Sequence, residues 1–402
     1  MENLEKEYFS YWDLYGKGHP HTLFFENDII NNIYFFFLIL LGFFLINIFF
    51  KKSNLTRINF LYCYHLIFTG LFILYVSTNV NDADTFYRYA YFPYFFTEEI
   101  KLFRIGSSTI ANIISIFNNF LNLSFLNWNI IFGFFGFIGI VLIDITLQKI
   151  IENKSKLIKI IFSLLILSPS LHFYTAGVGK EALSILSIGL LIFGIKFNKK
   201  YLIPIALIIM FFTRIHVFVV MLFSYAINLF FNSNLSLKLK ILTSLLSSII
   251  FLIIASKIIT GSFFSMEVFN KFYSFSEVQR GYLKDFRTWF DTTDFNSVKL
   301  MIYILFYPLS IFKISNYIDY VVVIENYVLL FLILTIFFKL YNARKTILEI
   351  KNIIFYSLFS FLMIFLLSHF ISVYGIILRQ KWIYITILLI FLAELLSLKK
   401  YK

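Results

Sequence analysis

The chain of 402 residues contains few charged residues, five prolines and a single cysteine. Only 14% of its residues are charged, whereas 60% are hydrophobic, and the mean hydropathy is +0.83. This balance excludes a soluble globular domain. The lone Cys63 excludes a disulfide within the chain. Because hydrophobic runs recur from residue 29 onward, we predict one integral membrane domain over residues 1–402.

Familiar catalytic motifs are also missing. No Cys and His residues have metal-ligand spacing, and no Ser–His–Asp set can be assigned. The stretch GVGKE resembles a phosphate loop only superficially, because that loop needs a glycine five residues before its Gly-Lys pair and Ser or Thr after it. Tyr174 and Glu181 occupy those positions. We therefore expect no ATP site, no metal and no other cofactor. The acidic N-terminus also predicts no signal peptide.

The hydrophobic runs predict an all-α transmembrane bundle. A spanning helix needs roughly 20 apolar residues. About 11 spans are predicted: 29–50, 59–77, 127–147, 157–173, 180–197, 201–213, 215–231, 240–260, 320–338, 352–373 and 382–398. The pieces 105–122 and 300–314 are amphipathic or interrupted, and we predict interfacial or re-entrant helices there. The main outer loops are then 78–126 and 261–319.

Basic residues are unevenly distributed over the loops. With the N-terminus outside, the inner segments hold more than half of the 35 Lys and Arg residues but few of the 22 Asp and Glu residues. This placement follows the positive-inside rule and puts the C-terminus in the cytoplasm. The net charge of +13 therefore reflects topology, and we expect a lipid bilayer as partner and no nucleic acid.

Residues 201–231 allow two interpretations. One long tilted helix would reverse the orientation of everything that follows and would put a Lys-rich C-terminus outside. Two helices that meet near Arg214 keep the basic loops inside, and we favour them. The first helix would then have about 13 residues and a length of about 20 Å, against a hydrocarbon core of about 30 Å. Arg214 and His216 would lie below the outer surface, in a cavity.

Residues 168–216 form a polar island in an otherwise apolar chain. The island contains five ionisable residues: His172, Lys180, Glu181, Arg214 and His216. Ionisable side chains at membrane depth cost several kcal/mol unless they are compensated, so they indicate a functional site by default.

Lys180, Arg214 and Arg379 are all predicted at outer, N-terminal ends of helices. The helix dipole disfavours a cation there, and so does the positive-inside rule. A bound phosphate or pyrophosphate would compensate all three, and Lys381 would assist Arg379. The structural alternative is snorkelling to lipid headgroups or pairing with an acidic neighbour: Glu181, Asp319 or Glu325.

The first outer loop contains the sequence NVNDADTFYRYAYF. Its carboxylates, Asp82 and Asp84, would remove a proton from an attacking sugar hydroxyl, and Arg88 is a candidate phosphate ligand. Two carboxylates alone specify no particular metal ion. The alternative is structural, because NDADT is also typical of a helix start.

Two histidines are further candidates, as bases or as phosphate ligands. His216 lies two residues from Arg214, whereas His172 has apolar neighbours and is equally explained as a hydrogen-bonded packing residue. The aromatic outer segment 261–298 has two equal interpretations: rings that stack on sugars, or amphipathic helices in the headgroups.

These residues together resemble a known family. The outer Asp loop, SPS followed by GKE, TRIH, YPLSIFKISNYIDYVVVIENY and the terminal YGIILRQKW are similar to polysaccharide polymerases of the Wzy and EpsG-like type, over about residues 75–390. The chain departs from the family pattern in three ways. No proline follows RQK, Lys381 replaces an arginine, and no single long outer loop dominates.

The resemblance implies an enzyme of the bacterial inner membrane that joins undecaprenyl-pyrophosphate-linked oligosaccharide repeat units on its outer face, as in O-antigen, capsule or exopolysaccharide synthesis. One lipid-linked glycan is the donor, and a second is the acceptor. A chain-length regulator and a flippase are implied partners. Residues resembling Arg214 and Arg379 would hold the pyrophosphate, while Asp84 or His216 would deprotonate the acceptor.

Two other functions stay open at this point. A multi-span glycosyltransferase that uses polyprenyl-phosphate sugars would depend on Asp82 or Asp84 more than on Arg214. A flippase or exporter of lipid-linked glycans would have polar residues on both sides of a central cavity, whereas this sequence concentrates them on the outer side.

Overall fold

The computed structural model describes residues 29–51, 53–79, 82–91, 106–233, 295–308, 317–341 and 352–397. The helices in these ranges form two compact units. Unit 1 comprises Met1–Ile145 and Leu171–Ile215, and unit 2 comprises Thr146–Ser170 and His216–Lys402. The predicted span 240–260 and the aromatic segment 261–298 lie outside the described residues, apart from the last few residues of that segment.

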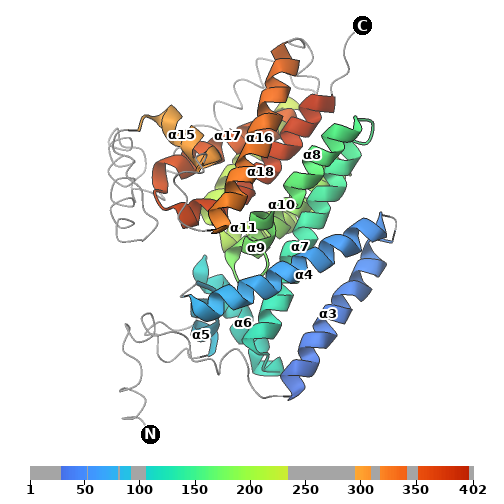
Figure 1. Ribbon diagram of the computed structural model, residues 1–402, viewed down its shortest axis with the longest axis vertical. Coiled ribbons are helices and arrows are strands. Elements are labelled where there is room, and N and C mark those ends of the chain that lie inside the picture. Colours follow the sequence, from blue (N-terminus) through green and yellow to red (C-terminus); the bar gives the residue numbers. More distant parts are fainter. Residues whose placement is uncertain are drawn as a thin grey trace. The chain divides into compact units, whose positions relative to one another are not determined.

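Unit 1 contains most of the N-terminal half of the described chain (Figure 1). Its helices are α3 (Ile29–Phe49), α4 (Leu55–Thr78), α5 (Asp82–Tyr91), α6 (Ser107–Leu121), α7 (Phe125–Ile150, whose last turn belongs to unit 2), α10 (Lys180–Lys196) and α11 (Leu202–Thr213). The short helix α9 (Pro169–Tyr174) begins in unit 2 and ends in unit 1.

Unit 2 contains the remaining helices. These are α8 (Lys156–Ile166), α12 (Ile215–Phe231, whose first residue is counted in unit 1), α15 (Ser297–Phe306), α16 (Tyr317–Tyr341), α17 (Ile353–Phe370) and α18 (Tyr374–Ser397). In this unit α18 packs against α17 and α16, and α15 packs against α17. Helix α15 ends just before Pro308, as the sequence predicts for an interrupted segment.

Within the residues that the structure describes, six helical segments are long and apolar enough to cross a membrane: Ile29–Phe49, Leu55–Ser77, Phe125–Ile150, Lys156–Tyr174, Ile353–Phe370 and Tyr374–Leu396. This is consistent with a multi-pass membrane protein. Helices α10, α11, α12 and α16 coincide with four further predicted spans, but their described apolar stretches are shorter. The total of about 11 spans and the orientation of the termini stay predictions.

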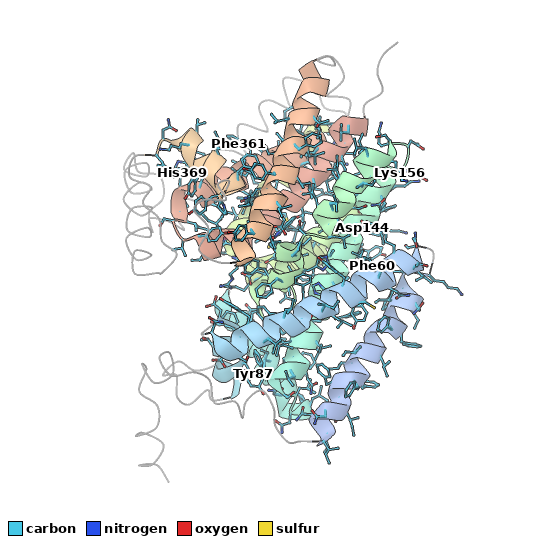
Figure 2. The ribbon with its side chains drawn as sticks, viewed as in Figure 1. Phe60, Tyr87, Asp144, Lys156, Phe361 and His369 are labelled. Carbon is cyan, nitrogen blue, oxygen red and sulfur yellow. The ribbon has the colours of Figure 1, made fainter. Side chains whose placement is uncertain are left out.

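Large apolar side chains cover the outer surfaces of the spanning helices. Phe60 on α4 and Phe361 on α17, both labelled in Figure 2, are more than half exposed. Helix α3 has only a sixth of its apolar stretch buried. Side chains of this kind favour contact with lipid over contact with water.

The middle of α7 approaches its neighbours closely because three glycines stand at every third position. A Cβ atom at Gly136 would lie 2.2 Å from the Thr175 carbonyl oxygen, and one at Gly139 would lie 2.5 Å from the backbone of Ile185 on α10. On α10, a Cβ atom added to Gly189 would lie 2.5 Å from the carbonyl oxygen of Gly139. Small residues let helix backbones pack at short range in membranes, so these glycines fix α10 against α7.

Two contacts show which helix ends of unit 1 lie together. Asn31, in the first turn of α3, accepts hydrogen bonds from Ser124 N (2.9 Å) and Asn127 Nδ2 (2.8 Å) at the start of α7. The carbonyl of Phe212, near the end of α11, accepts from Gly106 N (2.8 Å) and from Thr109 Oγ1 (2.7 Å) at the start of α6. We call the end of unit 1 where these contacts and α5 lie the α5 end.

The opposite end of unit 1 carries Arg57 of α4 and Asp144 of α7, which form an ion pair. Asp144 is labelled in Figure 2 on the part of α7 that lies beside α4. The helices of unit 1 therefore run back and forth between two ends, which is the alternation that the sequence predicts for this part of the chain.

Candidate functional site

Helix α5 places two carboxylates at the α5 end. It begins at Asp82, so the helix start that NDADT predicts is confirmed. Asp82 is exposed, whereas the Asp84 side chain is buried. Acidic residues in a first helical turn are favoured by the helix dipole, so a structural role accounts for part of this placement. Arg88 lies on the same helix, and its side chain is outside the described ones.

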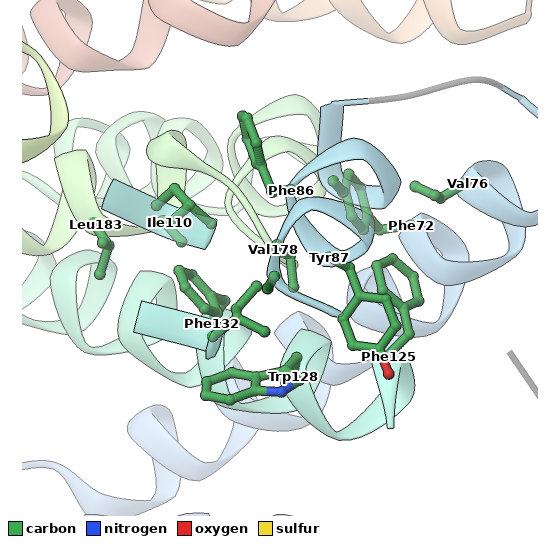
Figure 3. Packing of buried hydrophobic residues seen from close by; sticks show 14 of the residues in the cluster. Phe72, Val76, Phe86, Tyr87, Ile110, Phe125, Trp128, Phe132, Val178 and Leu183 are labelled. Atoms are coloured by element: carbon green, nitrogen blue, oxygen red, sulfur yellow. The ribbon is translucent and has the colours of Figure 1, made fainter. Parts of the chain in front are cut away.

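An apolar cluster holds α5 against the beginning of α10 (Figure 3). Phe86 and Tyr87 of α5 belong to the same buried cluster as Val178 and Leu183. The Tyr87 hydroxyl also donates to the Leu123 carbonyl oxygen at 3.3 Å. These contacts fix the carboxylate-bearing turn of α5 relative to the segment that leads into α10.

The loop before α10 is held by its own hydrogen bonds. Thr175 Oγ1 donates to the Leu171 carbonyl oxygen at 2.7 Å, and Val178 N donates to Asn129 Oδ1 at 3.0 Å. Gly177 has no room for a Cβ atom, which would lie 2.4 Å from Asn129 Oδ1. This loop therefore delivers Lys180 and the residue after it to a fixed position.

Lys180 is the first residue of α10, as predicted. Its side chain is partly exposed, and its Nζ atom lies 6.0 Å from the centroid of the Phe86 ring. That distance is at the limit of a cation–π contact. The ammonium group thus lies over the ring of Phe86, a residue of α5 that belongs to the buried cluster.

Arg214 is the single non-helical residue between α11 and α12. Its backbone angles, φ −148° and ψ 88°, are not helical, so residues 201–231 contain two helices that meet at Arg214. That both helices cross the membrane stays a prediction. Only 6% of the residue is exposed, and Nη2 donates to Glu181 Oε1 at 2.7 Å. Both side chains of this ion pair are 5% exposed. Pairing with Glu181 was one of the structural alternatives for Arg214, and the structure contains that pair.

Asp82, Asp84, Lys180, Glu181 and Arg214 are referred to below as the unit 1 polar site. All five stand at or next to a helix terminus at the α5 end, in a unit made largely of apolar side chains. The site contains two cations and three carboxylates. Glu181 and Arg214 are in direct contact, and Lys180 approaches α5 at Phe86. Lysine and arginine side chains are of the kind that binds phosphate, and carboxylates are of the kind that accepts a proton.

His172 lies deep inside unit 1. Its Nδ1 atom is 2.9 Å from Nδ1 of His65 on α4, and both residues are essentially inaccessible. One ring must donate and the other accept in this hydrogen bond. His65 is absent from the candidates that the sequence indicates, because a lone histidine in an apolar run has no distinguishing pattern.

The other predicted site residues belong to unit 2. His216 is an exposed residue in the first turn of α12, and Arg379 is partly buried on α18. The expectation that Arg379 stands at a helix N-terminus is wrong. Helix α18 begins at Tyr374, eight residues before the predicted start, so Arg379 and Lys381 lie in its second turn or beyond.

Lys381 lies in a buried polar cluster of unit 2. Its Nζ atom donates to Asn326 Oδ1 on α16. The adjacent Glu325 accepts from Ser170 N at 3.0 Å and from Ser170 Oγ at 2.5 Å, and Trp382 Nε1 donates to Ser170 Oγ at 2.8 Å. The sequence indicates Glu325 only as an ion-pair partner, and Ser170, Asn326 and Trp382 are not among the candidates that it indicates.

No three His, Cys, Asp or Glu side chains converge as a metal site requires within the ranges that the structure describes. No family model matches the chain, and it matches no curated protein and no solved structure.

Proposed function

We propose that this protein is a polysaccharide polymerase of the Wzy and EpsG-like type. It would join undecaprenyl-pyrophosphate-linked oligosaccharide repeat units on the outer face of a bacterial inner membrane. The observation that carries the proposal is the unit 1 polar site, which gathers cations and carboxylates at one end of an apolar helical unit. A lipid-linked substrate needs both features, because its polyprenyl chain lies among the acyl chains and its pyrophosphate lies near the surface.

The proposed reaction is a glycosyl transfer without a nucleotide. A hydroxyl oxygen of the acceptor glycan attacks the anomeric carbon of the donor glycan. The bond from that carbon to the pyrophosphate oxygen breaks, and the lipid pyrophosphate leaves with the electron pair. A base takes the hydroxyl proton, and cations stabilise the negative charge that develops on the leaving group.

Asp84 is the preferred base of the unit 1 polar site. Its carboxylate is buried at the start of α5, where few water molecules compete for the acceptor hydroxyl. Asp82, the exposed neighbour, is suited to orient the sugar. His216, Arg379 and Lys381 belong to unit 2 and have no part in the site proposed here. His172 is left with a packing role, because its ring is hydrogen-bonded to His65 inside the unit.

Lys180 and Arg214 are the proposed pyrophosphate ligands. Lysine presents a mobile point charge, and arginine presents a planar fork that fits phosphate oxygens. Both stand at helix termini of the α5 end. Arg88 lies on α5 and would reinforce them.

The proposal is tested by chain length. Asp84→Asn and Arg214→Gln should each abolish long polymer in cells that depend on this protein, while single lipid-linked repeat units still reach the outer face. Glycans would be separated by gel electrophoresis, and protein amounts in the membrane would be compared by immunoblot. Lys149→Gln is the matched control, because it removes a charge from an exposed ion pair that does not belong to the unit 1 polar site. Wild-type chain lengths in stably inserted Asp84→Asn and Arg214→Gln proteins would refute the assignment.

A second candidate is a transferase that adds one sugar from a polyprenyl-phosphate donor. One observation favours it: both carboxylates stand in a short helix that directly follows the second apolar span and packs against α6. In that case Asp82→Asn or Asp84→Asn would stop addition of one sugar, and Arg214→Gln would have a smaller effect. The product decides between the two, because a polymerase yields a ladder and this transferase yields one step.

A further inference from the structure

The Glu181 carboxylate occupies the position where an anion is expected to bind. Its Oε1 atom accepts from Arg214, and its Oε2 atom folds back over the start of α10. A Cβ atom added to Gly179 would lie 3.0 Å from Oε2. Gly179 forms the N-terminal boundary of α10 and provides no side-chain cap. The carboxylate therefore lies between a buried guanidinium and a helix N-terminus, and both groups attract anions.

We propose that Glu181 is an internal substitute for a phosphate group, and that it must leave Arg214 before a phosphate-type ligand binds there. This inference rests on the proposed function in assigning a pyrophosphate to Arg214. The ligand class is an esterified phosphate, either the pyrophosphate that joins a polyprenyl carrier to its glycan or the phosphodiester of a bilayer phospholipid headgroup.

Burial explains why an internal anion is needed. Both side chains of the pair are 5% exposed, and an isolated charge in such surroundings is strongly disfavoured. Glu181 makes the Arg214 position neutral when no substrate is bound. A pyrophosphate has more charge and more acceptor oxygens than a carboxylate, so it is able to replace Glu181 at the guanidinium.

Competition of this kind lowers the apparent affinity for the external anion. The apparent affinity equals the intrinsic affinity multiplied by the fraction of molecules in which Arg214 has released Glu181. Weakening the Glu181 contact should therefore tighten binding, whereas a purely structural salt bridge would lose binding together with stability when it is broken.

The experiment measures binding of inorganic pyrophosphate and of farnesyl pyrophosphate to the full-length protein in phosphatidylcholine nanodiscs. Glu181→Gln, which keeps the size of the side chain but removes its charge, should tighten both affinities by about tenfold or more. Arg214→Gln should abolish the gain when it is combined with Glu181→Gln. Equal or weaker affinity in a folded Glu181→Gln protein would overturn the proposal.

A second variant covers the case in which Glu181→Gln does not fold. Glu181→Asp retains the charge but shortens the side chain, so the contact with Arg214 is weakened and affinity should rise above that of the wild type. Affinity at or below the wild-type value would count against an internal substitute. Folding of each variant is followed by thermal unfolding.

Two comparisons separate the sources of the phosphate group and the two proposals. If phosphatidylglycerol nanodiscs remove the gain that Glu181→Gln shows in phosphatidylcholine, a bilayer headgroup is the ligand of the site; if they do not, the polyprenyl pyrophosphate is. Binding needs no polymerisation. A binding gain in Glu181→Gln together with normal polymer in Arg214→Gln cells would support the anion site and refute the polymerase.

Discussion

Arg57 and Asp144 form a two-point ion pair between α4 and α7. Arg57 Nε donates to Asp144 Oδ2 at 2.7 Å, and Nη2 donates to Oδ1 at 2.8 Å. The Asp144 side chain is only 3% exposed, whereas that of Arg57 is 28% exposed. A forked contact of this kind orients both side chains as well as attracting them, so it fixes the end of unit 1 opposite to the α5 end.

Replacing Asp144 by Ala should therefore destabilise the protein. It removes both acceptors and leaves a partly buried guanidinium, which costs about 2–4 kcal/mol. Arg57→Lys should cost less, because it keeps the charge but loses the second hydrogen bond. Thermal unfolding in detergent would measure both effects.

The ion pair between Lys149 and Glu152 provides the control. Its atoms are 2.8 Å apart, but both side chains are more than half exposed. The hydrogen bond from Lys149 lowers the pKa of the Glu152 carboxyl, yet exposed pairs contribute little to folding. Glu152→Gln should leave the unfolding temperature unchanged. An equal loss in Glu152→Gln and Asp144→Ala would contradict the interpretation of Arg57 and Asp144.

The contact between α7 and α10 gives a second stability prediction. Gly139→Ala or Gly189→Ala would push a methyl group into backbone atoms of the other helix, at 2.5 Å in both cases. Backbone cannot move aside as a flexible side chain would, so we expect a loss of about 1–3 kcal/mol. Gly70→Ala on α4 is the matched control, because no atom lies within 4 Å of the added Cβ. That variant should be as stable as the wild type, and a large loss there would show that the effect is not one of close packing.

The Ser170 hydroxyl contacts two helices of unit 2, because it donates to Glu325 of α16 and accepts from Trp382 of α18. Ser170→Ala removes its bond to Glu325 and the acceptor for Trp382 Nε1, which leaves buried polar atoms with fewer partners. Loss of about 1–3 kcal/mol is expected. Ser77→Ala, which removes only a local bond to the Leu74 carbonyl oxygen, should have no measurable effect on unfolding. Trp382 fluorescence would report the change in its surroundings, and an unchanged spectrum would contradict a role for Ser170.

The proposed orientation is open to chemical labelling. After replacement of the exposed Cys63 by Ala, one cysteine is introduced at Asn79, beyond α4, or at Lys199, between α10 and α11; both positions are exposed. A membrane-impermeant maleimide should label Asn79→Cys in intact cells and Lys199→Cys only after permeabilisation. The opposite pattern would reverse the topology, and labelling of both in intact cells would show that these positions lie on the same side.

Local signals made part of this structure predictable. The positive-inside rule predicts the break near Arg214, because two helices keep the basic loops inside. The apolar run 180–197 predicts a helix that begins at Lys180. The apolar run 382–398 predicts the start of the last helix too late, because Arg379 and Lys381 interrupt that run whereas α18 already begins at Tyr374. Charge alone is a poor guide to a helix end when the charged group can be buried against a partner.

The partners of buried polar groups were less predictable. Glu181 was one of several acidic residues open to Arg214, and the choice depends on how α10 packs against α11. Asn129 and His65 each stand as a single polar residue inside an apolar helix. Asn129 accepts a hydrogen bond from the loop before α10, and His65 is hydrogen-bonded to His172. The order of residues along the chain does not indicate such contacts.

The separation of 33 residues between Glu181 and Arg214 has a consequence for biosynthesis. Helix α10 leaves the ribosome before the arginine that neutralises its glutamate has been made. A carboxylate near the start of an apolar segment opposes partitioning of that segment into lipid. Helices α10 and α11 should therefore be released from the translocon together, as a hairpin closed by its own ion pair.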